Sequence, residues 1–127
     1  MHIHASAPHF FVRDVHRSVR FYVDVLGFEE PKIWGDPPCF AMPRRDGFIV
    51  MLNQGDADFI RPNGAYDCWD AYFWCDDVDA LWQDIKDKVE VVHGPEDRDY
   101  YGMREIGIKD PDGDMLVFAH DLEGDGK

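Results

Sequence analysis

Short apolar stretches alternate with turn-forming residues along the chain, and the spacing of the apolar positions switches between a strand period and a helix period. Residues 8–12 are apolar and rich in β-forming side chains, so they predict a first strand, and Asp14 after them predicts a helix N-cap. Apolar side chains then recur at i, i+4, i+7, i+8 and i+11 from Val15 onwards. This spacing predicts a helix with one buried face, and Gly27 is typical of its end.

Three further strands are predicted before position 55. They cover residues 28–33, 39–42 and 48–52, and the last of these is a continuous apolar run typical of a buried strand. Gly35-Asp36-Pro37-Pro38 separates the first two strands, and Arg44-Arg45-Asp46-Gly47 predicts a turn that ends in an Asp-Gly pair. The first half of the chain therefore predicts a β-α-β-β-β module.

The same order of patterns returns in the second half. Residues 55–64 have no periodicity and predict a connector, residues 70–75 predict a strand, and Asp76 predicts a helix cap. A second helical stripe over residues 78–89 is followed by a predicted strand at 89–92 and a polar loop at 94–99. Asp110-Pro111-Asp112-Gly113 then predicts a tight turn between two strands, because proline presets φ and glycine takes a positive φ.

These repeated patterns predict a single domain built from two related modules. The two predicted caps, Asp14 and Asp76, lie 62 positions apart. Module one covers about residues 7–54, the connector about 55–66 and module two about 67–120. Each module alone has too small a core to be stable, so we expect the two to fold together.

Composition restricts the partners of this protein. The chain has 26 acidic and 13 basic side chains, and its net charge of −13 repels nucleic acid and anionic lipid but attracts cations. No apolar run reaches the length of a membrane span, and the first six residues lack a secretion signal, so we expect a cytoplasmic protein. Cys39, Cys68 and Cys75 form no Cys-x-x-Cys pair and predict neither a disulfide framework nor a zinc site.

Two segments resemble the glyoxalase/bleomycin-resistance/extradiol-dioxygenase superfamily, which has the vicinal oxygen chelate fold. The first runs from Val12-Arg13-Asp14 through Ser18-Val19-Arg20-Phe21-Tyr22 to Val25-Leu26-Gly27-Phe28, and the second is Tyr101-Gly102-Met103-Arg104-Glu105 with the Asp-Pro-Asp-Gly turn and the strand after it. The resemblance covers about residues 7–120. It implies an α+β fold in which the two modules form a curved eight-stranded mixed sheet, here termed the cup, with the helices on its outer face.

The metal-dependent enzymes of this superfamily place their ligands on the first and last strands of each module. By position these ligands fall on Ala7, Met51, Asp70 and Val117. Two apolar side chains, a thioether and one carboxylate do not make a site for a divalent ion. The resemblance therefore implies a protein of the metal-free bleomycin-resistance branch, a homodimer without a cofactor that sequesters an antibiotic-like aromatic ligand, with a cationic ligand as a further option.

Strand alternation indicates which side chains line the cup. It places His9, Tyr72 and Trp74 on the same side as Asp70. The predicted strand before the Asp-Pro-Asp-Gly turn, with the loop that precedes it, adds Tyr101, Met103 and Glu105. The candidate ligand-binding residues are His9, Trp34, Asp70, Tyr72, Trp74, Tyr101, Met103 and Glu105. Aromatic rings offer stacking faces to a planar ligand, and a carboxylate among them favours a cationic one.

Other interpretations of the same residues stay open. The aromatic side chains could pack the cup shut, Asp70 could be a solvated residue at the start of a strand, and Glu105 could pair with Arg104 or Arg98 at an edge. The alternative function is a metal-dependent lyase, isomerase or dioxygenase with the rearranged ligands His9, Asp70 and Glu105, and a third is a purely structural or interaction module. His120 belongs by alternation to the helix side of its strand.

Overall fold

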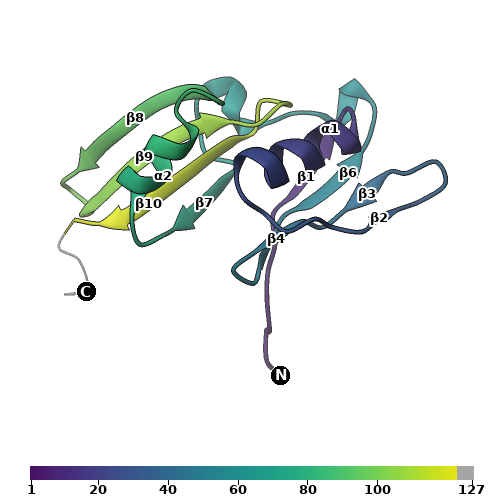
Figure 1. Ribbon diagram of the computed structural model, residues 1–127, viewed down its shortest axis with the longest axis horizontal. Coiled ribbons are helices and arrows are strands. Elements are labelled where there is room, and N and C mark those ends of the chain that lie inside the picture. The colour runs from purple at the N-terminus through teal and green to yellow at the C-terminus, as the bar shows by residue number, and fades with distance from the viewer. Residues whose placement is uncertain (123–127) are drawn as a thin grey trace. The chain divides into compact units, whose positions relative to one another are not determined.

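The computed structural model describes residues 1–122, and the chain divides into two compact units at Pro62 (Figure 1). Four strands of the first unit form a mixed sheet in the order β1-β6-β3-β2, in which β1 and β6 run parallel. The elements of this unit are β1 (His9–Val12), α1 (Val15–Arg20), a π-helical turn (Phe21–Val25), β2 (Ile33–Trp34), β3 (Phe40–Ala41), β4 (Arg44–Arg45), β5 (Phe48–Ile49), β6 (Met51–Gln54) and a 3₁₀ turn (Ala57–Phe59).

Helix α1 begins at the predicted cap. The Asp14 carboxylate accepts hydrogen bonds from the backbone N–H groups of His16 and Arg17, at 3.0 and 3.2 Å. Val15 and Val19 are buried, which confirms the predicted apolar face. The prediction of one regular α-helix is wrong in its last part, because residues 21–25 form a π-helical turn. The helical segment ends at Gly27, which has a φ of +75°.

The strands of the first unit are shorter than predicted. Of the second predicted strand, only Glu29, in an isolated bridge with Arg44, and Ile33, at the start of β2, pair with another strand. The Phe28 N–H bonds back to the helix end, and Pro31 has no N–H to donate. The apolar run at 48–52 divides at Val50 into the end of β5 and the start of β6. The predicted turn at 44–47 is the tip of a β4-β5 hairpin, whose two central residues have positive φ.

The second unit repeats the arrangement of the first. Its sheet has the order β7-β10-β9-β8, and its first and last strands, β7 and β10, again run parallel. The elements are a 3₁₀ turn (Asn63–Tyr66), β7 (Ala71–Trp74), α2 (Val78–Ile85), β8 (Glu90–Arg98), β9 (Met103–Lys109) and β10 (Met115–Asp121). The same strand order in both units confirms the predicted duplication and the α+β class.

Two sequence predictions for the second unit are wrong. The N-cap of α2 is Asp77, whose carboxylate accepts from the Ala80 N–H at 3.0 Å, and not Asp76. The predicted loop at 94–99 is mostly strand, because β8 continues to Arg98 across two register shifts in its pairing with β9. An edge strand pairs with a neighbour on one side only, so its pairing tolerates polar residues and bulges without ending the strand.

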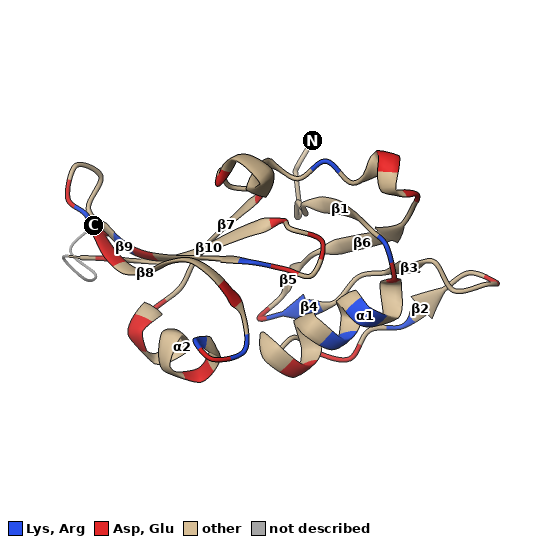
Figure 2. Cartoon of the chain, turned by 90° about the horizontal axis from the view of Figure 1, so that it is seen from above, with Lys and Arg blue, Asp and Glu red and all other residues tan. Residues whose placement is uncertain are grey.

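Helix α2 packs on one face of the second sheet (Figures 1 and 2). Phe73 and Phe118 stack on this face with ring centroids 4.9 Å apart. His120 accepts a hydrogen bond at Nδ1 from the Val78 N–H at 2.8 Å, so it lies on the helix side of β10 as alternation predicted. The other face of the sheet is free of α2 and carries the residues of the candidate site.

The predicted hairpin between β9 and β10 forms around a turn of paired carboxyl groups. Asp110 accepts at Oδ1 from the N–H groups of Asp112 and Asp114, both at 3.0 Å, and Gly113 has a φ of +91°. The Asp114 side chain is buried beside Asp110, with Asp70 also contributing negative charge. Burial, followed by repulsion from Asp110 and Asp70, raises the pKa of Asp114 to about 9.

Asp114→Asn should therefore change how stability depends on pH. The pKa is raised in the folded state, so the wild-type protein keeps this proton when the unfolded chain has lost it, and stability falls as pH rises from about 4 towards 9. We expect the variant to lose most of this fall and to be more stable than the wild type at pH 8, with little difference near pH 4. Urea unfolding across this range measures the effect, and the exposed control Asp84→Asn should behave as the wild type. Parallel curves for the wild type and Asp114→Asn would contradict the prediction.

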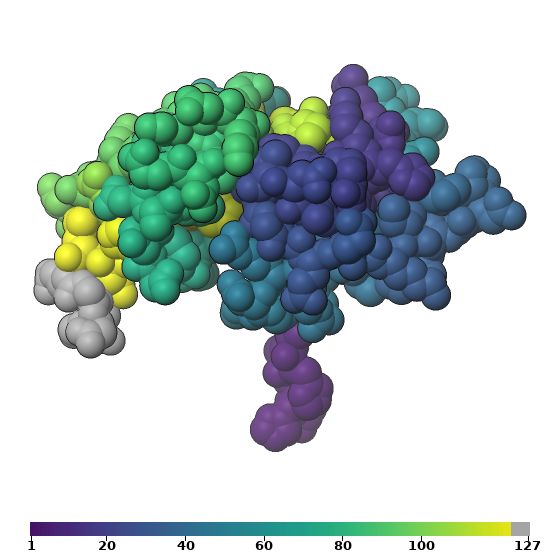
Figure 3. All heavy atoms as spheres, viewed as in Figure 1, coloured from purple at the N-terminus to yellow at the C-terminus, as the bar shows by residue number. Residues whose placement is uncertain are grey.

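Two observations concern the rest of the described chain. No helix within residues 1–122 combines the length and apolar character needed to cross a membrane. Residues 1–6 are exposed and extend away from the first unit (Figure 3). Residues 3–6, together with Gly47, Phe48 and Ile49, border a hollow of about 370 Å³, which none of the predicted ligand-binding residues lines.

Candidate functional site

The sheet face of the second unit that is turned away from α2, here named the aromatic face, brings four of the eight predicted residues together: Tyr72, Trp74, Tyr101 and Glu105. Strand pairing aligns Trp74 of β7 with Ala119 of β10 and Glu105 of β9. The next row aligns Tyr72 with Val117 and Gly107. Val117 and Ala119 lie in the middle of the two rows, and across them the Tyr72 side chain reaches the carboxylate of β9.

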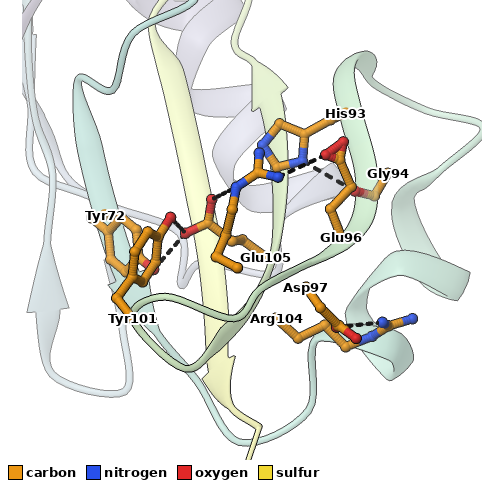
Figure 4. A network of polar contacts seen from close by, with 9 residues as sticks. Tyr72, His93, Gly94, Glu96, Asp97, Tyr101, Arg104 and Glu105 are labelled. Carbon is orange, nitrogen blue, oxygen red and sulfur yellow. Dashed lines mark hydrogen bonds and ion pairs between the residues drawn. The ribbon is translucent and has the colours of Figure 1, made fainter.

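Glu105 is the polar centre of the aromatic face, and its carboxylate is almost fully buried at 1% exposure. Its Oε2 atom accepts hydrogen bonds from the hydroxyl groups of Tyr72 and Tyr101, both at 2.7 Å. Its Oε1 atom lies 3.3 Å from Nε of Arg98. Figure 4 shows the two tyrosine hydroxyls converging on the carboxylate.

Both tyrosines are held in their neutral form. Burial, with the hydrogen bond to Glu105 as the next cause, raises the pKa of Tyr101 to about 12. The same causes in the same order raise the pKa of Tyr72 still further. Each hydroxyl therefore keeps its proton at neutral pH and directs it towards Glu105.

Arg98 balances the charge of Glu105. Its Nη1 atom also donates to Glu96 at 2.9 Å, and this hydrogen bond is the main cause that raises the pKa of Arg98.

His93 lies on the same strand as Arg98, with Nδ1 3.1 Å from the Gly94 carbonyl oxygen (Figure 4). A Cβ atom on Gly107 would lie 2.8 Å from the His93 ring, so glycine makes room for this side chain over the sheet.

Three aromatic rings form a ladder at the β7 edge of the face. The ring of Tyr72 lies 4.8 Å from that of Trp69 on one side and 4.8 Å from that of Trp74 on the other. Trp74 is 73% exposed and Trp69 46%. These two rings are therefore accessible to solvent, whereas Val117 and Ala119, the sheet positions between β7 and Glu105, are fully buried.

Asp70 and Met103 have structural surroundings. Asp70 accepts at Oδ1 from the Asn63 N–H at 2.8 Å, and at Oδ2 from the N–H groups of Gly64 and Met115 at 2.9 and 2.8 Å. It is thus neither a solvated strand-start residue nor an unpaired carboxylate facing a ligand. Met103 is buried, with 7% exposure, at the end of β9.

The alternative proposed for Glu105, an ion pair at an edge, is half correct. Glu105 pairs with Arg98, but the pair is buried on the carboxylate side. Arg104 points to the other face, where it contacts Asp97 at 2.8 Å and Asp79 of α2 at 3.0 Å.

The two remaining predicted residues belong to the first unit. Nε2 of His9 lies 3.3 Å from the side-chain nitrogen of Asn53, and its ring meets Phe11 edge-on at 4.9 Å. Trp34 is 38% exposed and lies beneath the ammonium group of Lys32, 5.6 Å from its ring centroid. That His9 and Trp34 join the residues of the aromatic face in one site stays a prediction.

No group of three or more His, Cys, Asp or Glu side chains within residues 1–122 is arranged to hold a metal ion. Among the rearranged ligands considered above, Asp70 uses both oxygens to accept backbone N–H groups, and Glu105 is engaged by two tyrosines and an arginine. These donor sets do not fit a divalent ion, which needs several free oxygen or nitrogen ligands.

Sequence reasoning missed Trp69 and His93 as neighbours of the site. Trp69 precedes β7, and by alternation it would lie on the opposite side from Tyr72. Only its position next to the predicted strand could have indicated that its ring contacts the site. His93 comes directly after the predicted strand at 89–92, because the polar residues that follow it predicted a loop. Both positions depend on local departures from regular strand geometry, which a period-two pattern does not detect.

The comparisons with known proteins decide the family. The sequence profile described as "Glyoxalase/Bleomycin resistance protein/Dioxygenase superfamily" matches residues 2–118. The chain belongs to this superfamily. A comparison with curated proteins gave no match.

Solved structures of the same fold cover nearly the whole chain. A protein of unknown function from Agrobacterium tumefaciens str. C58 is 32% identical, with a TM-score of 0.65 over 96% of this chain and 95% of that one. The bleomycin-binding protein from the bleomycin producer Streptomyces verticillus, in complex with copper(II)-bleomycin, is 23% identical, with a TM-score of 0.69 over 93% and 96%. TnmS3, an antibiotic binding protein from Streptomyces sp. CB03234, is 20% identical, with a TM-score of 0.75 over 94% and 96%. The last two comparisons show a shared fold.

Proposed function

We propose that this member of the superfamily is a small-molecule binding protein that sequesters a planar, cationic aromatic ligand on the aromatic face without a metal ion. The observation that carries the proposal is the exposed Trp74 ring, which packs at a tilt against Tyr72 beside the buried Glu105. An exposed tryptophan offers a large apolar stacking surface, and a ligand that covers it removes that surface from water.

The charge of the chain supports a cationic ligand. Eighteen of the 26 acidic side chains follow Pro62, but only six of the 13 basic ones do. Red segments accordingly outnumber blue ones in the second unit of Figure 2. Glu105 itself is balanced by Arg98, so the attraction comes from the summed field of this unit, with the electron-rich ring of Trp74 adding a cation–π contact.

Two of the solved structures named above support small-molecule binding as the function. Two proteins with this fold are described as a bleomycin-binding protein and an antibiotic binding protein. We propose that this chain belongs to the metal-free bleomycin-resistance branch and acts as a homodimer in the cytoplasm, as the family resemblance implies.

Trp74→Ala should weaken binding of proflavine, a flat acridinium cation, by about tenfold or more, since a stacked aromatic contact contributes about 1–2 kcal/mol. Titration followed by proflavine fluorescence measures the affinity, and urea unfolding should show a near-normal stability because this side chain is 73% exposed. Phe48→Ala, which removes an exposed ring from β5, serves as the matched control. We expect EDTA to leave the affinity unchanged.

Two outcomes would contradict the proposal. Unchanged affinity in Trp74→Ala would remove the aromatic face as the binding site. Binding of proflavine by neither the wild type nor any variant, at dye concentrations up to the millimolar range, would remove the proposed ligand class.

A further inference from the structure

We infer that Glu105 determines which ligands the aromatic face accepts, by fixing the protons of Tyr72 and Tyr101 so that both hydroxyl oxygens act as acceptors. The site would then select planar aromatic ligands that carry N–H or O–H donors, such as aromatic amines, amidines and phenols. It would discriminate against N-alkylated ligands of the same shape and charge. This inference rests on the proposed function.

The first step concerns the available protons. A tyrosine hydroxyl has one proton to donate and lone pairs that accept. Both protons are directed to the same oxygen of Glu105, at 2.7 Å, and the raised pKa values of the two phenols keep those protons in place. What the two hydroxyls still offer a ligand is therefore lone pairs, and Tyr72 offers more than Tyr101, because the Arg98 guanidinium also donates to the Tyr101 oxygen.

The second step concerns the orientation of the carboxylate. Arg98 approaches the other oxygen of Glu105, at 3.3 Å, and is itself held by Glu96 at 2.9 Å. The guanidinium thus keeps Oε1 on its own side and leaves Oε2 to the tyrosines. Because the carboxylate is 1% exposed, water does not compete for the tyrosine protons there.

The third step concerns exposure. Tyr101 is 38% exposed and Tyr72 is half-buried, whereas Glu105 is hidden behind them. A ligand stacked on Trp74, whose ring lies 4.8 Å from that of Tyr72, would meet the tyrosine oxygens and not the carboxylate. In a ligand that offers only acceptors, the lone pairs would face the lone pairs of the tyrosine oxygens. Such a ligand would lose its hydrogen bonds to water and gain none from the protein.

Glu105→Gln should invert this pattern. With the amide oxygen turned towards Arg98, the amide NH₂ group takes the position of Oε2 and donates to the tyrosines. Both hydroxyl protons are then free to point to the ligand. The substitution keeps the size of the side chain, so its main effect is the reversal of donor and acceptor roles.

The experiment compares two acridinium dyes with the purified full-length protein. Proflavine carries two primary amino groups, whereas in acridine orange both amino groups are dimethylated and donate no hydrogen bond. We expect the wild type to bind proflavine about tenfold more tightly, the effect of one to two hydrogen bonds. In Glu105→Gln this ratio should fall to about one or reverse. Steric exclusion of the methyl groups would leave the ratio high in both proteins.

The controls separate this role from others. Asp97→Asn removes one negative charge from the neighbouring strand β8 without touching the tyrosines, because Asp97 pairs with Arg104, and it should keep the wild-type ratio. Trp74→Ala should weaken both dyes together. Tyr101→Phe and Tyr72→Phe each remove one acceptor and should lower the ratio, which keeps the inference testable even if Glu105→Gln does not fold.

The outcomes distinguish the inference from the proposed function. If neither dye binds, the proposed function fails and the role of Glu105 in specificity fails with it. If both dyes bind with equal affinity, or if the ratio is the same in Glu105→Gln and in the tyrosine variants as in the wild type, the proposed function stands and the role of Glu105 is overturned.

Discussion

Gly64→Ala should lower the free energy of unfolding by on the order of 3 kcal/mol or more, because there is no space for a methyl group. A Cβ atom at this position would overlap the carbonyl oxygen of Gly113 and would lie 2.9 Å from the backbone nitrogen of Met115. The obstructing atoms are backbone and not the end of a flexible side chain. Relief would require the 3₁₀ turn to move away from the β9-β10 hairpin.

The measurement is urea unfolding followed by tryptophan fluorescence. Gly102→Ala is the matched control in the same unit, since nothing lies within 4 Å of its Cβ position and only its φ of +71° opposes the substitution. We expect about 1–2 kcal/mol there, the strain of a left-handed residue with a side chain. Equal losses in the two variants would show that the steric overlap at Gly64 costs no more than the strain of one left-handed residue at Gly102.

Asp70→Ala is expected to have the second largest effect on stability, a loss of about 3 kcal/mol. The substitution removes the acceptor for three backbone N–H groups, those of Asn63, Gly64 and Met115. A buried donor left without a partner costs about 1–3 kcal/mol, and bonds to a charged acceptor are the stronger ones. The carboxylate joins the turn at the start of the unit to the start of β10, so its loss releases both.

Asp77→Ala is the control for Asp70→Ala. The Asp77 carboxylate accepts from a single N–H, that of Ala80, so its removal should lower the free energy of unfolding by only about 1 kcal/mol. The proflavine titration adds a second readout. If Asp70→Asn weakened dye binding with little loss of stability, Asp70 would be a ligand contact as the sequence predicted, and not the structural residue that its three hydrogen bonds indicate.

The charge of the site differs from what an unpaired carboxylate would produce. The Glu105 carboxylate accepts from two tyrosine hydroxyls and pairs with a guanidinium, so its role is to fix the orientation of these neighbouring side chains. A ligand cation would be attracted by the acidic second unit at long range and held at short range by the rings of Trp74 and Tyr72. We therefore expect salt to weaken the affinity for both dyes to a similar degree, while the proflavine preference stays nearly constant.

Local sequence patterns were sufficient for the parts of this protein that depend on neighbours within a few residues. The Asp14 cap, the two apolar helix faces, the β9-β10 turn and the assignment of Tyr72, Trp74 and Glu105 to one side of their strands all follow from backbone geometry and side-chain alternation. The duplication was detectable for the same reason, since each module repeats the same local signals.

Tertiary structure decided the partners of the polar residues. Tyr72 and Glu105 are 33 positions apart and meet only because β10 aligns β7 with β9 in one register. The continuation of β8 to Arg98 provides the cation for Glu105, and it depends on edge pairing that a polar sequence does not indicate. Asp70 has the residue type of a ligand contact, but the backbone N–H groups that fold around it make it a structural residue. Long-range hydrogen bonds are set by register and chain packing, and these depend on the whole unit and not on any one segment.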